Sequence, residues 1–238
     1  MRFFLDPTIL ILLPAIGFTI WAQSKIKSTY ARFSKVGNRR GLTGADVAQA
    51  ILRDENIALT NDPMSYTGGA ACSLEATPGH LSDHYDPRSR ALRLSEDVYY
   101  GQSVAALGIA AHEVGHAIQH ARLYSPLMMR NVVYPICRFG TTLAWPLLIV
   151  GLIAVPILLK VAVAMFTLAV FFTVLTLPVE YNASSRAMRA LASGGYLDEE
   201  ELDGAHKVLS AAALTYVAAA AMAVFQLLRV VLLTNSRN

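Results

Sequence analysis

The chain has 238 residues, of which 54% are hydrophobic and 16% are charged, and its mean hydropathy is +0.42. In soluble domains about a quarter of the residues are charged, so an ordinary soluble core does not explain this excess of apolar side chains. The net charge of +3 is mild, with neither a glycine-rich phosphate loop nor a dense basic run, which argues against nucleic acid as a partner. The two cysteines, Cys72 and Cys137, are too few for a disulfide framework or a thiolate zinc site.

The first element in chain order is an apolar segment without charge, residues 7–22. A secretory signal peptide is the alternative interpretation. Its start would be nearly uncharged, however, and no small-x-small cleavage site stands before Gln23. We therefore predict an uncleaved transmembrane anchor over residues 1–23.

Residues 24–138 have the composition of a folded, soluble portion. A helix through Leu52 is expected to open at Thr43 or Gly44, with Asp46 in its first turn. The Gly-, Ser- and Thr-rich residues 66–78 indicate short strands and turns, and residues 82–87 indicate a loop. Alternating apolar and polar side chains predict a strand over residues 91–95. Ser103 is expected to cap a helix from residue 104 to about residue 123.

A second apolar block, residues 141–178, is interrupted only by Lys160 and is about twice the ~20 residues needed to cross a bilayer. It predicts a transmembrane hairpin over residues 139–178 with a turn near residues 156–160. Residues 179–207 follow, and residues 208–238 supply a fourth, C-terminal span. Buried helices of a large soluble core are the alternative, but the remaining chain is too short to cover so much apolar surface.

The basic residues that flank these spans are distributed unequally. Those on one side are Lys25, Lys27, Arg32, Lys35, Arg39, Arg40, Arg130, Arg138, Arg186, Arg189 and Lys207, and those on the other are Arg2, Lys160 and Arg237. Cytoplasmic segments carry the excess of Lys and Arg. We therefore expect a multi-pass protein of the cell (inner) membrane, with residues 24–138 and 179–207 in the cytoplasm.

The predicted helix at Ser103 contains His112-Glu113-Val114-Gly115-His116, an HExxH motif. Histidines at i and i+4 lie on one face of a helix, where both imidazoles can bind one zinc ion. Glu113 is then placed to take a proton from the attacking water as general base. A helix with satisfied surface histidines is the alternative, but small and apolar neighbours surround this motif, and unpaired polar groups among them are costly.

A catalytic zinc site needs a third protein ligand and an open position. Glu180 is the candidate, because it follows the predicted hairpin and returns to the same membrane face as His112 and His116. A solvated interfacial glutamate is the alternative. His120, one turn after His116, is a candidate for substrate binding or for support of the metal ligands, and His84 is a candidate for stabilising an oxyanion.

These residues stand in stretches that resemble the YugP-type membrane zinc metallopeptidases along essentially the whole chain. The stretches are Ser82-Asp83-His84-Tyr85-Asp86-Pro87-Arg88, Leu92-Arg93-Leu94-Ser95, Ala111-His112-Glu113-Val114-Gly115-His116-Ala117-Ile118-Gln119, Pro178-Val179-Glu180-Tyr181-Asn182-Ala183-Ser184 and Ala211-Ala212-Ala213-Leu214-Thr215-Tyr216-Val217-Ala218. The chain is more distantly similar to HtpX-type and CAAX prenyl endopeptidases, whose glutamate ligand is followed four residues later by an aspartate. Here that position is Ser184, a weaker partner for a zinc-bound imidazole. Asn182 is a possible substitute.

The resemblance and the residues together predict a mainly α membrane protein with about four transmembrane helices and a cytoplasmic α+β, zincin-like metallopeptidase portion. The expected cofactor is Zn²⁺ and the expected partners are the lipid bilayer and a peptide or protein substrate, including membrane-associated ones. The strand at residues 92–95 is expected to receive the substrate as an added β-strand. Two alternatives stay open: a non-catalytic zinc-binding scaffold or adaptor, and proteolysis at bilayer depth.

Overall fold

The computed structural model describes residues 7–235, and most of them are helical. The chain forms two compact units: one takes residues up to 24, 128–178 and from 214 onward, and the other takes residues 25–127 and 179–213. Arg2 and Arg237, which contribute to the predicted membrane topology, lie outside the described residues. The first unit is built only of helices, and the second unit carries the sheet and the HExxH helix.

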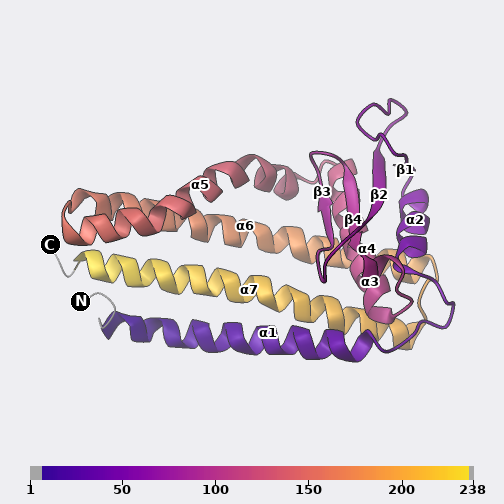
Figure 1. The fold of residues 1–238 in the computed structure, drawn as a ribbon, viewed down its shortest axis with the longest axis horizontal. Coiled ribbons are helices and arrows are strands. Elements are labelled where there is room, and N and C mark those ends of the chain that lie inside the picture. The colour runs from indigo at the N-terminus through magenta and orange to yellow at the C-terminus, as the bar shows by residue number, and fades with distance from the viewer. Residues whose placement is uncertain (1–6, 236–238) are drawn as a thin grey trace. The chain divides into compact units, whose positions relative to one another are not determined.

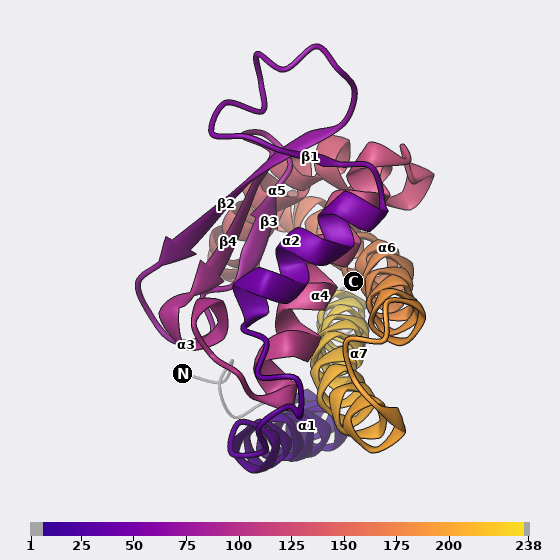
Figure 2. The same ribbon diagram turned by 90° about the vertical axis from the view of Figure 1, so that its right-hand side faces the viewer.

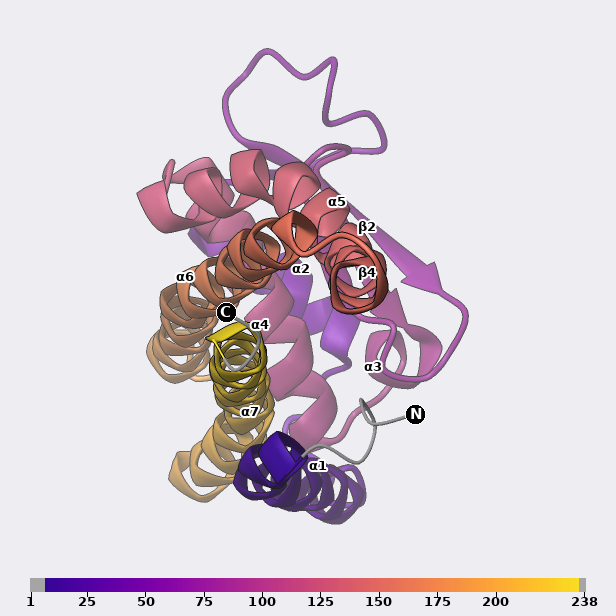
Figure 3. The ribbon, with the colours of Figure 1, turned by 90° about the vertical axis from the view of Figure 1, so that its left-hand side faces the viewer.

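Four long helices contribute to the first unit (Figures 1 and 3). The 3₁₀ helix η1, Pro7–Leu12, leads into α1, Leu13–Phe33, and the others are α5, Ser125–Ile153, α6, Ile157–Ser193, and α7, Glu199–Asn235. Each is long and apolar enough to cross a membrane, which is the predicted number of spans. Leu148 of α5, Ala162 of α6 and Val230 of α7 share one buried apolar cluster. Residues 125–138, assigned above to the soluble portion, belong to α5.

The sheet of the second unit has the order β1-β2-β4-β3. Its strands are β1, Ala58–Leu59, β2, Ala71–Thr77, β3, His84–Asp86, and β4, Ala91–Ser95. Strands β1, β2 and β4 are parallel, and β3 pairs antiparallel with β4. The strand predicted at residues 91–95 is confirmed, whereas the loop predicted at residues 82–87 is wrong over residues 84–86, which form β3.

This pairing overturns the expectation that residues 92–95 receive a substrate strand. Strand β4 has β2 on one side and β3 on the other, so both of its edges are already hydrogen-bonded. An added strand needs a free edge. The strand that ends the sheet beside β4 is β3, a segment too short and too polar to be recognised as a strand from its sequence.

Three shorter helices lie wholly within the second unit, and each of them contacts the sheet (Figure 2). They are α2, Gly44–Asp54, α3, Glu96–Tyr99, and α4, Val104–Ala121. The predicted helix start at Thr43 or Gly44 and the predicted cap at Ser103 are confirmed. Thr43 and Asp46 form a reciprocal capping box on α2, and the Ser103 hydroxyl accepts a hydrogen bond from the Ala106 amide on α4. Helix α4 lies in the main core, where Leu107 and Ile118 are almost fully buried.

Candidate metal centre

Three potential metal ligands from two helices meet in the second unit. His112 and His116 lie one turn apart on α4, and Glu180 lies on α6. Glu180 Oε2 is 3.3 Å from His112 Nε2 and 3.5 Å from His116 Nε2. The glutamate is 3% exposed, so water does not neutralise its charge, and a cation or a proton must do so. The three residues expected from the sequence are therefore brought together.

The spacing of these atoms fits a tetrahedral ion. One nitrogen from each imidazole and one carboxylate oxygen all lie within 4.8 Å of one another. An ion with ligand bonds of about 2.1 Å holds neighbouring tetrahedral ligands about 3.4 Å apart, which is close to both measured separations. Two neutral imidazoles and one carboxylate are also a ligand set that zinc accepts. No fourth His, Cys, Asp or Glu of the described residues joins this group.

The charge state of His116 reflects the same geometry. Burial disfavours its imidazolium, but the hydrogen bond to Glu180, together with the charges of Glu113 and Glu180, raises its pKa above the ordinary value. The buried carboxylate of Glu180 thus favours a positive charge beside His116, from a proton or from a metal ion. Metal uptake is expected to displace this proton, because a histidine ligates metal in its neutral form.

The ring nitrogens that face away from the ligand group also have partners. His112 Nδ1 lies 3.1 Å from Ser184 Oγ, and His116 Nδ1 lies 3.0 Å from Gln119 Oε1. The amide of Gln119 in turn donates to the Val179 carbonyl and to Asn182 Oδ1. Both rings are therefore held with Nε2 toward Glu180, because partners of this kind fix the tautomer and orientation of an imidazole ligand.

Ser184 and Asn182 thus act at different histidines. Ser184 contacts His112 directly, and Asn182 reaches His116 only through Gln119. The role of Gln119 is not evident from the sequence, although its place three residues after His116 puts it on the same helix face. It is fully buried, so its amide requires hydrogen-bond partners, and His116 provides one of them.

The two helices of this site are in close contact at Gly115. A Cβ atom on Gly115 would lie 2.5 Å from the carbonyl oxygen of Ala183. Only glycine allows the backbone of α4 to approach α6 this closely, and Ala183 stands next to Ser184 and three residues after Glu180. The contact at Gly115 therefore fixes how far Glu180 lies from both histidines.

Gly115→Ala is expected to push α4 and α6 apart, which weakens metal binding and lowers the free energy of unfolding by about 1–3 kcal/mol. Gly108→Ala is the matched control on the same helix, since its Cβ would meet Ala205 at an ordinary 3.4 Å. Thermal unfolding and zinc titration of both variants test this prediction. Equal metal affinity in the two variants would contradict it.

Glu113 contacts the edge strand. Its Oε2 accepts a hydrogen bond of 3.0 Å from the backbone amide of Tyr85, in the middle of β3. This amide does not point toward β4, so the carboxylate of Glu113 sits at the free edge of the sheet and one residue along the chain from His112. A group at this position can contact both a metal-activated water and a peptide that lies along β3.

The two other histidines singled out in the sequence lie apart from the ligand group. His120 Nδ1 is 2.7 Å from the hydroxyl of Tyr85, so it supports β3 rather than a metal. His84 is exposed on β3, and its Nδ1 donates to the Ser82 carbonyl at 2.7 Å. The predicted role of His84 at an oxyanion stays a prediction.

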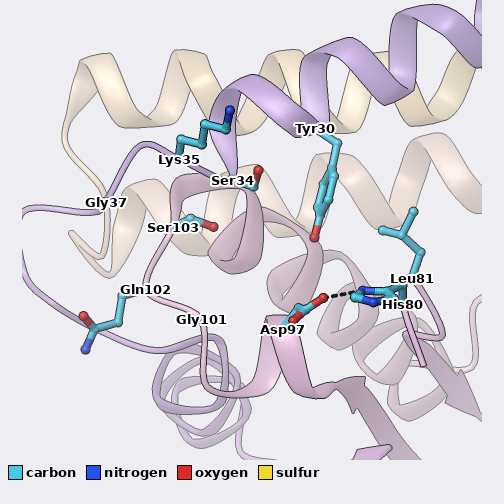
Figure 4. A pocket seen from close by; sticks show the side chains of 10 residues that line it. All are labelled: Tyr30, Ser34, Lys35, Gly37, His80, Leu81, Asp97, Gly101, Gln102 and Ser103. Carbon is cyan, nitrogen blue, oxygen red and sulfur yellow. Dashed lines mark hydrogen bonds and ion pairs between the residues drawn. The ribbon is translucent and has the colours of Figure 1, made fainter. Parts of the chain in front are cut away.

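A cavity of about 780 Å³ lies at the N-terminal end of α4, beside Ser103 (Figure 4). His80 Nδ1 and Asp97 Oδ2 are hydrogen-bonded at 2.5 Å in this cavity, and the hydroxyl of Tyr30 points toward Asp97. It contains none of the three ligand residues. Its size therefore does not make it the candidate metal centre, which lies at His112, His116 and Glu180.

Comparison with known proteins agrees with this geometry. Residues 8–235 match the model of a family described as "Putative neutral zinc metallopeptidase". The chain belongs to this family. It is also 44% identical over 233 residues to a protein of Bacillus subtilis (strain 168) named "Putative membrane protease YugP", with 97% of this chain and 98% of the relative covered. No solved structure matches the chain. The family name supports zinc as the metal and a protease function in general.

Proposed function

We propose that this protein is a membrane-anchored zinc endopeptidase that hydrolyses peptide bonds. The observation that carries the proposal is the convergence of His112, His116 and Glu180 at separations that suit one zinc ion, with Glu113 on the adjacent position of the same helix. The family match supports the metal and the reaction class.

In this proposal Glu113 moves the protons of the reaction. When zinc is bound, it supplies a Lewis acid for the scissile carbonyl and for the attacking water. Glu113 accepts a proton from that water and passes it to the leaving amine. The amide of Tyr85 holds the Glu113 carboxylate in place through its hydrogen bond. Ser184 and Gln119 keep both imidazoles oriented for the metal.

The free edge of β3 is the proposed docking position for the substrate. Strand β3 is the last strand of its sheet, and its Tyr85 amide already faces away from β4 toward Glu113. Because Glu113 holds the Tyr85 amide at this edge, an extended peptide that lies along β3 would place a carbonyl beside the general base. This position replaces the one expected on residues 92–95.

The site is proposed to face the cytoplasm, because the Lys and Arg distribution orients residues 24–138 and 179–207 that way. In the described part of the chain the candidate spans are α1, α5, α6 and α7, whereas the HExxH helix α4 is not one of them. This argues for a site outside the bilayer rather than for proteolysis at bilayer depth.

A non-catalytic scaffold is the less favoured interpretation, because structural zinc sites usually have four protein ligands.

Metal removal tests the proposal. The full chain, purified in detergent, is expected to contain one zinc ion per molecule and to cleave an unstructured protein such as casein. A chelator should abolish cleavage, and stoichiometric zinc should restore it while magnesium does not. Cleavage that persists after the zinc has been removed, as measured by elemental analysis, would refute the proposed mechanism.

A further inference from the structure

We propose that a pocket beside Glu113 binds the substrate side chain next to the cleaved bond, and that Arg90 selects a side chain that ends in a carboxylate. The proposal rests on the peptidase function proposed above and adds the class of residue that the site accepts. The cavity, here called the Arg90 pocket, has a volume of about 240 Å³, enough for one large side chain.

The Arg90 pocket begins one helical turn beyond the proposed general base. Ala117 and His120 line it, four residues after Glu113 and His116 respectively, and residues four apart share one face of a helix. Tyr85 contacts both Glu113 and the Arg90 pocket. Its backbone amide donates to Glu113, whereas its side chain lines the pocket and its hydroxyl contacts His120. A peptide whose carbonyl lies beside Glu113 therefore has a side chain within reach of the pocket.

Arg90 provides the charge of this pocket. No Asp, Glu or Lys is among the residues that line it. His120 adds no charge near neutral pH, because burial and then the nearby Arg90 lower its pKa. One nitrogen of Arg90, Nη1, donates to the Pro63 carbonyl at 3.3 Å, and no carboxylate in the described part of the chain forms an ion pair with Arg90. A guanidinium has five N–H donors, so most of them stay available to a substrate carboxylate.

The remaining walls suit an apolar stem. Ile57, Ala71 and Ala121 contribute aliphatic surface, and the Cys72 thiol stays uncharged because burial raises its pKa to about 12. The backbone of Arg90 is fixed at a φ of 51°, uncommon for a residue with a Cβ atom, and its carbonyl accepts from the Ser73 amide. A cation in the wall of a largely apolar pocket favours glutamate, whose two methylene groups separate its carboxylate from the peptide backbone.

The test is a cleavage assay on a peptide library that varies the residues on both sides of the cleaved bond, with products identified by mass spectrometry. The zinc-loaded full chain is expected to prefer glutamate over lysine at one of these positions by about 10- to 100-fold. Arg90→Met should remove this preference, Arg90→Glu should reverse it toward lysine, and Arg90→Lys should keep most of it.

Arg88→Met is the matched control, because Arg88 is exposed in the same connection between β3 and β4 and does not line the pocket. It is expected to leave the preference unchanged. The circular dichroism spectrum of Arg90→Met should match that of the wild type, which shows that the variant is folded. The proposal is overturned if the wild type shows no preference for glutamate, or if Arg90→Met keeps it.

A binding measurement separates this proposal from the peptidase function. Fluorescence anisotropy would measure the binding of two labelled peptides, which differ only in having glutamate or lysine at this position. The proteins would be the Glu113→Gln variant and the double variant that also carries Arg90→Met. The pocket is supported if the glutamate peptide binds more tightly than the lysine peptide and if Arg90→Met removes this difference. This conclusion holds even if the wild type cleaves nothing, in which case only the peptidase function fails. Equal binding of the two peptides overturns the pocket while leaving the peptidase function open to its own test.

Discussion

Glu113→Gln is expected to lower kcat/KM for peptide cleavage by about 10²- to 10⁴-fold while leaving the metal bound. Glutamine keeps the shape of glutamate and can still accept the hydrogen bond from the Tyr85 amide, so β3 stays in place. It cannot accept a proton from water at neutral pH. Steady-state kinetics and elemental analysis of the same preparation measure the two effects separately.

The matched control is Glu75→Gln. Glu75 lies on β2 of the same sheet, where it contacts Ser73 and Arg93 and no ligand residue. This variant is expected to keep both activity and zinc. If Glu113→Gln cleaved peptides at the wild-type rate, Glu113 would not be the general base, and the proposed assignment of the proton transfers would be wrong.

Glu180→Gln is expected to lose stoichiometric zinc and, with it, peptidase activity. The loss of metal affinity should exceed the roughly 10- to 100-fold that changes in supporting residues cause. The physical reason is charge as well as ligation: Glu180 is 3% exposed and carries the negative charge that balances a dication between two neutral imidazoles. Zinc content after gel filtration, and competition with a fluorescent chelator, measure the loss.

Glu201→Gln separates this effect from a general loss of stability. Glu201 is also a buried glutamate, 7% exposed, but it accepts hydrogen bonds from the backbone amides of Arg39 and Asp198. Its replacement should lower the unfolding temperature and leave one zinc ion per chain. Full zinc occupancy in Glu180→Gln would remove Glu180 from the ligand set.

Much of the second unit is predictable because the signals are local. The caps at Thr43 and Ser103 satisfy backbone amides within three residues, so they are visible in the sequence. The two histidines follow from the helical repeat. Glu180 is 68 residues from His112, yet it is predictable, because two expected membrane crossings would return the chain to the side from which it started. The family resemblance adds the same assignment from whole stretches of sequence.

The parts that are not predictable depend on non-local contacts. Strand β3 has three residues and exists because β4 and Glu113 bind its backbone, which no residue pattern in 84–86 signals. The edge of the sheet was therefore expected at β4. The support of His116 by Gln119 depends likewise on Val179 and Asn182, which come from another helix.

The distance along the chain between the metal ligands has a consequence for biosynthesis. Both histidines leave the ribosome before the hairpin of α5 and α6, and Glu180 follows only after that hairpin has been synthesised. A nascent or truncated chain that ends before residue 180 has two imidazoles and the proposed general base but lacks the Glu180 carboxylate that would complete the site. The proposed metal centre is thus completed only late in translation, once most of the apolar sequence has been made.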